Sequence, residues 1–204
     1  MRSIRVAAAA ITGYLLGTIP SADVAAGLAT DGTVDLRASG SGNPGGANAV
    51  GVLGKKWGYG VMGADIAKAA LAARIGQRVA GATGAHVGGT ASVIGHCFPV
   101  WNGFKGGKGV ACSVGQCLAT FPAYFPIDLG VAAVTSTRSW KSRAFAATNV
   151  ASVFWVVGGL LWWRRGWANL WGPKPTKALP IAAATSSAVI VYRFATARPP
   201  AARR

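Results

Sequence analysis

A polar loop joins two long apolar segments in the run Gly95-His96-Cys97-Phe98-Pro99-Val100-Trp101-Asn102-Gly103-Phe104-Lys105-Gly106-Gly107-Lys108-Gly109-Val110. Its glycines let the backbone adopt positive φ values and approach an anion, while Lys105 and Lys108 add positive charge. The loop is not a nucleotide-binding P-loop, because Asn102 replaces the first glycine of that motif and Gly109 replaces its serine or threonine. The run predicts a phosphate-binding loop at the end of a membrane span. The alternative is a flexible turn whose lysines only set topology.

The composition indicates an integral membrane protein. Of the 204 residues, 51% are hydrophobic and 13% are charged, against about 25% charged residues in soluble domains. There are 21 Lys and Arg residues against 5 acidic ones, which gives a net charge of +16. The cations are scattered in short loops, which favours anionic lipids and an anionic substrate as partners over nucleic acid. Cys97, Cys112 and Cys117 fit neither a disulfide framework nor a metal motif, so we expect packing cysteines and no cofactor or metal.

Apolar runs predict spans at 4–20, 57–74, 79–101, 145–163 and 178–194. The apolar region from Val110 to Thr137 is too long for one span, since about 28 helical residues would reach about 42 Å across a core of about 30 Å. Pro122 and Pro126 interrupt this region, so two short helices joined near 122–127 are expected. The first run follows two arginines as a signal peptide would, but later runs are equally apolar, which favours a retained span.

The predicted fold class is therefore an all-α integral membrane protein, a bundle of about seven transmembrane helices with short cytoplasmic motif loops. We expect a single domain over 1–196 and a basic cytoplasmic tail over 197–204. With the N-terminus outside, the segments 21–56 and 102–108 share the cytoplasmic side with 138–143 and the tail. That side carries twelve cations and the opposite side eight. The bias is small, so this topology depends mainly on the grouping of the polar motifs.

Two further polar features accompany the lysine-glycine loop. The first is the run Ser39-Gly40-Ser41-Gly42-Asn43-Pro44-Gly45-Gly46-Ala47-Asn48, whose small and amide residues can hold a ligand or form an ordinary turn-rich loop. The second is Asp65 with Lys68, which share one helix face at membrane depth. These two can serve a functional site or merely neutralise each other. His96 can contact a phosphate or cap its helix, and His86 is expected to be a packing residue.

These motifs resemble the bacterial acyl-phosphate:glycerol-3-phosphate acyltransferases (PlsY), seven-helix inner-membrane enzymes of about this length. Residues 40–48 are similar to the family pattern S-G-N-x-G-x-x-N, and residues 95–111 are similar to G-H-x-F-P…F-K-G-G-K-G-V-A. Similar residues also occur at 53–56, at Asp65 with Lys68, and at Thr137-Arg138. The resemblance therefore extends over roughly residues 10 to 145.

The resemblance implies transfer of a fatty acyl group from acyl phosphate to the sn-1 hydroxyl of glycerol 3-phosphate, forming lysophosphatidic acid and phosphate. It implies a bacterial inner-membrane enzyme whose site faces the cytoplasm, and it leaves room for an upstream enzyme that forms acyl phosphate. The implied catalytic residues are His96 and Lys108, and the intramembrane pair is Asp65 with Lys68. The implied substrate- and phosphate-binding residues are Ser41, Asn43, Gly45, Asn48, Lys105, Gly106, Gly107, Gly109, Arg138, Lys141, Ser142 and Arg143.

The chain departs from the family pattern in several places. Gly51 stands where the family has an arginine, and Lys141 takes the place of a serine, with Ser142 one position late. Tyr192 begins a segment where the family tends to have His-Arg-x-Asn, and the chain contains no glutamate. Lys141 and Arg143 are the candidates to replace the missing cation. The alternative is that activity is reduced or altered.

No nucleophile or catalytic triad is evident in the sequence. The H-x-x-x-x-D signature of other glycerolipid acyltransferases is also missing, since Ala91 follows His86 and Trp101 follows His96 at the position of the aspartate. Direct attack by the glycerol hydroxyl is expected, with a substrate phosphate favoured over His96 as the base. Two other classes stay open: a catalytically degenerate homologue that binds a phosphorylated glycerol or lipid, and a small anion transporter, for which no internal repeat is seen.

Overall fold

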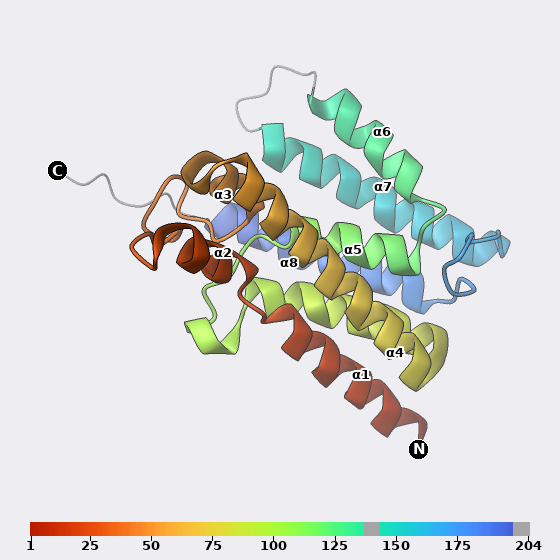
Figure 1. The fold of residues 1–204 in the computed structure, drawn as a ribbon. Helices are drawn as coiled ribbons and strands as arrows, with labels where there is room; N and C mark the ends of the chain where they lie inside the picture. Colours follow the sequence, from red (N-terminus) through yellow and green to blue (C-terminus); the bar gives the residue numbers. More distant parts are fainter. Residues whose placement is uncertain (137–142, 198–204) are drawn as a thin grey trace.

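The computed structural model describes residues 1–136 and 143–197. All regular secondary structure in this part of the chain is helical (Figure 1). The helices are α1 (Arg2–Gly17), α2 (Ser21–Thr30), α3 (Gly46–Leu53), α4 (Lys55–Cys97), α5 (Val110–Thr120), α6 (Phe125–Ser136), α7 (Arg143–Arg165) and α8 (Ala178–Thr196), with a short 3-10 turn η1 (Val100–Asn102). The predicted tail lies almost wholly outside the described residues.

Helix α4 is in fact two antiparallel helices. The backbone is non-helical at Ala80 (φ −139°, ψ 23°) and at Gly81 (φ 65°, ψ −153°), and the chain reverses there. The positive φ of Gly81 is readily available only to glycine. With α4 counted as two, the described residues form seven helices besides the short α2 and α3, so the predicted all-α, seven-helix bundle is confirmed. The division of 110–137 into two short helices, α5 and α6, is also confirmed.

The boundaries differ from the predicted ones at two places. The first half of α4 continues to about residue 79, because its arginines stay helical at the end of the bundle. The second half ends at Cys97 rather than 101, where Phe98 leaves helical geometry before Pro99. The segment 21–56 contains α2 and α3, which the loop-like composition did not predict.

By length and hydropathy alone, three described helical stretches could cross a membrane, namely 2–30, 144–165 and 178–196. Helix α5 is apolar but shorter. The first half of α4 carries several charged residues, among them Asp65 and Lys68. The second half carries none, but its glycines and two histidines lower its mean hydropathy, so neither half meets this criterion. Both were expected as spans because the sequence around these residues is apolar.

Small residues let the helices approach closely, as is common in membrane proteins. A Cβ on Gly13 of α1 would collide with the backbone of Gly88, and one on Gly115 of α5 would collide with the backbone of Ile66. A buried polar contact also joins three helices, since Gln116 donates to the Thr90 hydroxyl at 3.0 Å and accepts from Ser186 at 2.8 Å. The core is therefore packed backbone to backbone around α4.

The polar motifs gather at one end of the bundle. Figure 1 shows α2, α3, the loop that precedes α5 and the end of α8 at this end, on the left. The N-terminus, the turn inside α4 and the loop between α7 and α8 lie at the opposite end. The seven-helix arrangement thus brings together the two glycine-rich loops that the sequence places about 50 residues apart.

Candidate active site

The first motif loop, residues 39–48, is organised around the buried side chain of Asn48. Its Oδ1 accepts a hydrogen bond from the backbone N–H of Ser41 at 2.8 Å. Its Nδ2 donates to the carbonyls of Leu36 at 2.9 Å and Ser39 at 3.0 Å. Because both amide donors and the oxygen are engaged, Asn48 shapes the loop from within.

The second motif loop, residues 98–109, folds back onto the end of α4. The backbone N–H of Gly106 donates to the carbonyl of Cys97 at 3.2 Å, and that of Gly107 donates to the carbonyl of His96 at 3.1 Å. The sequence led us to expect that these two N–H groups hold a phosphate. In the structure they close the loop, so direct contact of Gly106 and Gly107 with phosphate stays a prediction.

Arg193 of α8 holds the same loop from the other side. Its guanidinium donates to the carbonyl of Gly106 at 2.6 Å and to that of Gly107 at 3.1 Å, and it lies 5.4 Å from the centre of the Phe98 ring. A Cβ on Gly107 would collide with the imidazole of His96. The loop is therefore clamped between two helices, and glycine is required for the fit.

The free backbone donors of this region lie at the start of α5. Gly109 is the N-cap residue, with a φ of 87° that favours glycine. Within the described part of the chain, no acceptor is found for the backbone N–H groups of Lys108, Gly109, Val110 and Ala111. The N–H groups of a helix N-terminus lack intrahelical acceptors and carry the positive end of the helix dipole. Such an end is suited to a phosphate.

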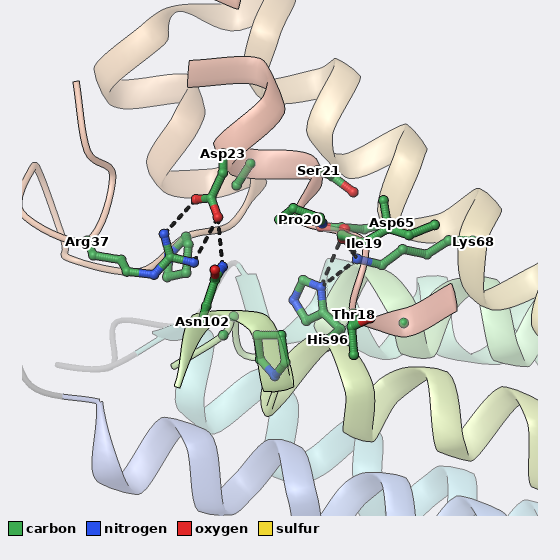
Figure 2. A pocket seen from close by; sticks show the side chains of 16 residues that line it. Thr18, Ile19, Pro20, Ser21, Asp23, Arg37, Asp65, Lys68, His96 and Asn102 are labelled. Carbon is green, nitrogen blue, oxygen red and sulfur yellow. Dashed lines mark hydrogen bonds and ion pairs between the residues drawn. The ribbon is translucent and has the colours of Figure 1, made fainter. Parts of the chain in front are cut away.

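A polar network ties α2 to both motif loops (Figure 2). Arg37 donates to the two carboxylate oxygens of Asp23 at 2.6 and 3.1 Å, and Asn102 donates to the same carboxylate at 2.8 Å. The Nε of Arg37 also donates to the carbonyl of Lys105 at 3.1 Å. This two-point ion pair fixes the second loop against the first.

A second charged cluster lies below the loops, on α4. The ammonium of Lys68 is 2.8 Å from Oδ1 of Asp65, donates to the carbonyl of Ile19 at 2.8 Å and lies 3.2 Å from Nδ1 of His96. Asp65 Oδ1 is also 3.4 Å from that nitrogen. Figure 2 shows Lys68 directed at both Ile19 and His96. All three side chains of the cluster are buried, and a cavity of about 20 Å³, room for one water, separates them from the Asp23 network.

These contacts determine what His96 can do with its other nitrogen. An ammonium only donates, so a hydrogen bond from Lys68 requires that Nδ1 accept and that the imidazole proton reside on Nε2. If His96 instead donated from Nδ1 to Asp65, Nε2 would be protonated in the cation and unprotonated in the neutral ring. The contact of Nδ1 with Lys68 is the shorter one, at 3.2 Å against 3.4 Å for Asp65, and it makes Nε2 a hydrogen-bond donor.

Among the described residues, Asp65, His96 and Cys112 could hold a metal ion. Their donor atoms lie within 4.8 Å of one another and all three residues are buried. Oxygen, nitrogen and sulfur donors together suit Zn²⁺. However, the ammonium of Lys68 already neutralises the carboxylate, so the geometry is that of an ionic hydrogen-bonded cluster. The expectation that no metal is required stays a prediction. The three cysteines are free and buried, as expected for packing residues.

A cavity of about 490 Å³ lies between the motif loops, α4, α5 and α7. Its polar wall contains Ser41, Asn43, Asp65, His96 and Lys108, and its apolar wall includes Met62, Ile66, Val110, Val114 and Ala147. A second cavity of about 240 Å³ adjoins it between α5, α6 and α7, since Val110, Val114, Ala147 and Thr148 line both. The site therefore continues from a polar chamber into an apolar groove.

Lys108 brings the positive charge to this chamber. Its ammonium lies 4.4 Å from the centre of the Phe194 ring and lines the cavity. Burial, and after it the nearby Arg193 guanidinium, lowers the pKa of Lys108 below its usual range. A bound phosphate would oppose both effects, because it favours the charged ammonium.

The structure brings together most of the residues implied by the resemblance. Those that line the larger cavity are Ser41, Asn43, Gly45, Asn48, Asp65, His96, Lys108 and Gly109. Lys68, Gly106 and Gly107 instead line the water-sized cavity, and Lys105 is exposed and lines neither. Arg138, Lys141, Ser142 and the side chain of Arg143 lie outside the described residues. The individual roles of all these residues stay predictions.

Four residues of the site were not identified as such from the sequence. Asp23 belongs to no motif, and Asn102 was noted only as a mismatch to the P-loop motif. Arg37 was counted only among the topology cations, and Arg193 was noted only within a departure from the family. Their partners are 14 to 87 residues away. The available signal in the sequence was the small number of acidic residues. An aspartate in so basic a chain is expected to pair with a nearby cation.

The chain matches the sequence profile of the glycerol-3-phosphate acyltransferases over residues 7–198. It is 43% identical over 166 residues to a glycerol-3-phosphate acyltransferase of Maricaulis maris, covering 81% of this chain and 74% of that one. It is 39% identical over 153 residues to one of Allorhizobium ampelinum, covering 72% of each.

Two crystal structures of PlsY, an integral membrane glycerol 3-phosphate acyltransferase, have a similar fold. The glycerol 3-phosphate form gives a TM-score of 0.74 at 32% identity, over 93% of this chain and 88% of that one. The lysophosphatidic acid form gives 0.71 at 31% identity, over 93% and 87%.

Proposed function

The chain belongs to the glycerol-3-phosphate acyltransferase family, and from this we propose that its acyl donor is an acyl phosphate and its acceptor the sn-1 hydroxyl of glycerol 3-phosphate. It is an integral membrane enzyme that forms lysophosphatidic acid. The observation that carries the donor assignment is the chamber itself. A cationic, N–H-rich end meets an apolar groove, which suits a substrate that carries a phosphate directly on a fatty acyl group.

In the proposed step, the sn-1 oxygen of glycerol 3-phosphate attacks the carbonyl carbon of the acyl phosphate. The new carbon–oxygen ester bond forms as the bond between that carbon and the phosphate oxygen breaks. The hydroxyl proton passes to the departing phosphate, so lysophosphatidic acid and inorganic phosphate are the products. Because a mixed anhydride is already activated, the protein mainly orients two anions and stabilises the oxyanion at the acyl carbon.

Lys108 and the N-terminus of α5 are assigned to the phosphate of the donor. This support is geometric: the ammonium lines the chamber, and the free N–H groups of Gly109 and Val110 belong to residues that line it as well. Ser41 and Asn43 of the first motif loop supply hydrogen bonds to the second phosphorylated substrate. Lys68 and Asp65 act as positioning residues, since both lie against Nδ1 of His96 and Lys68 does not line the chamber.

His96 is assigned the role of a hydrogen-bond donor in the reaction. Its Nδ1 lies 3.2 Å from the Lys68 ammonium, and when it accepts from that group the imidazole proton resides on Nε2. This leaves the phosphate of a substrate as the base for the hydroxyl proton. A donor at this position can stabilise either a phosphate oxygen or the developing oxyanion.

The acyl chain is assigned to the groove between α5, α6 and α7. The wall hydroxyls of Ser113 and Thr148 donate to carbonyls of their own helices at 2.8 and 2.7 Å, so they add little polarity. Asp128 is the one charged side chain among the described residues of the lining, which are otherwise mainly apolar. Tyr124 and Trp155 lie at the far end of the groove, within a buried aromatic cluster. The groove reaches about 12 Å along α7 from Ala147 to Trp155.

The missing family arginine at Gly51 leaves open space on α3, since a Cβ there would meet no neighbouring atom. Helix α7 begins beside the chamber, because Ala144 lines it. Lys141 and Arg143 directly precede that residue and are proposed to supply the replacing charge. Arg143→Ala or Lys141→Ala should then lower activity strongly, whereas Gly51→Arg should change it little.

The motif-loop end of the bundle is proposed to face the cytoplasm of a bacterial cell, where glycerol 3-phosphate is available. Single cysteines at 43 and 105, in a background lacking the three native cysteines, should be shielded from an impermeant thiol reagent in intact cells. They should react in inverted vesicles. Reaction of either one from outside would reverse the proposed orientation.

The direct test of the donor is an assay of the purified full chain with an acyl phosphate and labelled glycerol 3-phosphate. Lysophosphatidic acid and inorganic phosphate should appear in equal amounts. An acyl thioester of the same chain serves as the rival donor, and Lys108→Ala is the comparison variant. Transfer from the thioester but not from the acyl phosphate would overturn the donor assignment and leave the family membership intact.

A further inference from the structure

The end of the bundle opposite the motif loops carries an unneutralised basic pocket. Arg2 and Arg5 of α1 and Arg78, just before the α4 turn, line a cavity of about 450 Å³. No acidic residue lines it, and within the described part of the chain these three guanidinium groups have no hydrogen-bond or ion-pair partner. Figure 1 shows the start of α1 beside the turn of α4 at this end. All three residues are exposed, and three guanidinium groups around one hollow attract an anion.

An apolar groove of about 480 Å³ continues from this basic pocket, since Arg2 lines both cavities. The groove runs between the second half of α4 and α8. Its lining residues recur every three or four positions on each helix, as one helix face requires: Thr83, Val87, Ala91 and Ile94 on α4, and Ala178, Ile181 and Thr185 on α8. Lys177 adds a further cation to the lining.

His86 is the unusual residue of this groove. Its side chain is 1% exposed, it lines the groove, and neither ring nitrogen has a partner among the described residues. A buried polar group without a partner is rare and costly, and it calls for a ligand or a water. The other buried polar residue of the lining, Thr90, is satisfied, since its hydroxyl accepts from Gln116 at 3.0 Å.

We propose that these two connected cavities bind one anionic phospholipid. The phosphate lies among Arg2, Arg5 and Arg78, an ester carbonyl accepts a hydrogen bond from His86, and one acyl chain fills the groove between α4 and α8. His86 is five residues beyond Gly81, which places it about 7.5 Å deeper than the α4 turn. An ester carbonyl lies below the phosphate of a phospholipid in the same sense. This site is separate from the catalytic chamber, with which it shares no lining residue.

The arginine pocket, the apolar groove and the unpartnered His86 together favour a lipid over a free anion. Inorganic phosphate would satisfy the arginines but leave His86 unpartnered and the groove without an occupant. A neutral lipid would fill the groove but leave the arginines unpartnered. An arginine guanidinium matches a lipid phosphate in both charge and hydrogen-bond geometry. The proposal also explains why many cations lie at the end of the bundle that takes no part in catalysis.

The test is native mass spectrometry of the purified full chain in detergent, with equal amounts of phosphatidylglycerol and phosphatidylcholine of matched acyl chains. The wild-type protein should retain one phosphatidylglycerol at least tenfold more often than phosphatidylcholine. The double variant Arg5→Gln/Arg78→Gln should lose this preference. The matched control Arg164→Gln/Arg165→Gln also removes two arginines from the same end, but these line neither cavity, so the preference should persist.

The role of His86 is tested with diester and diether forms of phosphatidylglycerol, which differ in the ester carbonyl. Wild type should retain the diester form preferentially, and His86→Leu should not discriminate, whereas His86→Gln, which keeps a donor, should. Equal retention of the two headgroups by wild type would overturn the proposal. So would an equal loss of preference in the control variant, or full displacement of the lipid by inorganic phosphate at equal concentration.

Discussion

Arg193→Ala is expected to weaken catalysis by releasing the second motif loop from α8. Arg193 touches no cavity-lining side chain that we assign to substrate, and it acts on the loop through the carbonyls of Gly106 and Gly107 at 2.6 and 3.1 Å. Those two residues precede Lys108, so their position sets that of the ammonium. Loss of the guanidinium should therefore raise KM for the phosphorylated substrates and lower kcat together.

The magnitude follows from the two hydrogen bonds. A hydrogen bond from a charged group contributes about 1.5–3 kcal/mol, so the pair is worth about 3–6 kcal/mol before compensation. Two backbone bonds from the same glycines to α4 survive the change, and water replaces part of what is lost. We therefore expect a net loss of about 2–3 kcal/mol in the free energy that holds the loop in position. This corresponds to a roughly 30- to 150-fold fall in kcat/KM.

The assay is the initial rate of lysophosphatidic acid formation, with thermal unfolding of each variant as the check on folding. Arg193→Lys keeps the charge but not the two-point contact, so its kcat/KM should fall between those of wild type and alanine. Tyr192→Phe is the neighbouring control, because that residue is 56% exposed. A folded Arg193→Ala protein with kcat/KM within twofold of wild type would refute the clamp.

Three further results are expected. Lys108→Ala should raise KM for a phosphorylated substrate more than tenfold, about 1.4 kcal/mol. The matched change Lys105→Ala should have little effect, because that side chain is exposed outside the chamber. Equal effects of the two changes would contradict the assignment of Lys108, rather than Lys105, to the phosphate. Because the pKa of Lys108 is lowered in the free enzyme and bound phosphate favours its charged form, KM should be constant at low pH and rise as pH increases through that pKa. In Lys108→Arg this rise should move to higher pH, and an unmoved KM profile would assign it to another group. Trp155→Ala should shift the preferred acyl chain to greater length, and each added methylene should raise kcat/KM up to about fourfold. Trp162→Ala should cause no such shift, because Trp162 belongs to the same aromatic cluster but lies outside the groove. The same shift in both variants would count against the groove as the acyl site.

The sequence was sufficient for the helices because their signal is local. Apolar runs, together with Pro122 and Pro126, predicted seven helices, two of them short, and the structure confirms them. The helices α2 and α3 were not predicted, because their glycine-rich surroundings resemble a loop and their stability comes from packing against α4. Helix ends were displaced by a few residues, at the first half of α4 where its arginines stay helical and at the second half where Phe98 leaves helical geometry before Pro99.

The site was predicted less completely, because much of it is made by contacts between distant residues. Lys108, Ser41 and Asn43 were found from local motifs and do line the chamber. Asp23 and Asn102 could not be found in this way, since a bond over 79 residues leaves no pattern in either neighbourhood. Asn48 was expected to bind substrate, and this stays a prediction: it lines the chamber, while its amide shapes the loop from within.

The distribution of cations shows what the sequence could not resolve. From the sequence alone, Lys105, Lys108 and the arginines could not be assigned different roles around the glycine-rich loop. In the structure, Arg37 and Arg193 bind the carbonyls of that loop at Lys105, Gly106 and Gly107. With these carbonyls held by the arginines, Lys108 and the free N–H groups at the start of α5 are left to meet an anion in the chamber. Under the proposed assignment of Lys108 to a substrate phosphate, these two arginines act on the site without touching the substrate, so their loss should affect substrate binding and turnover together.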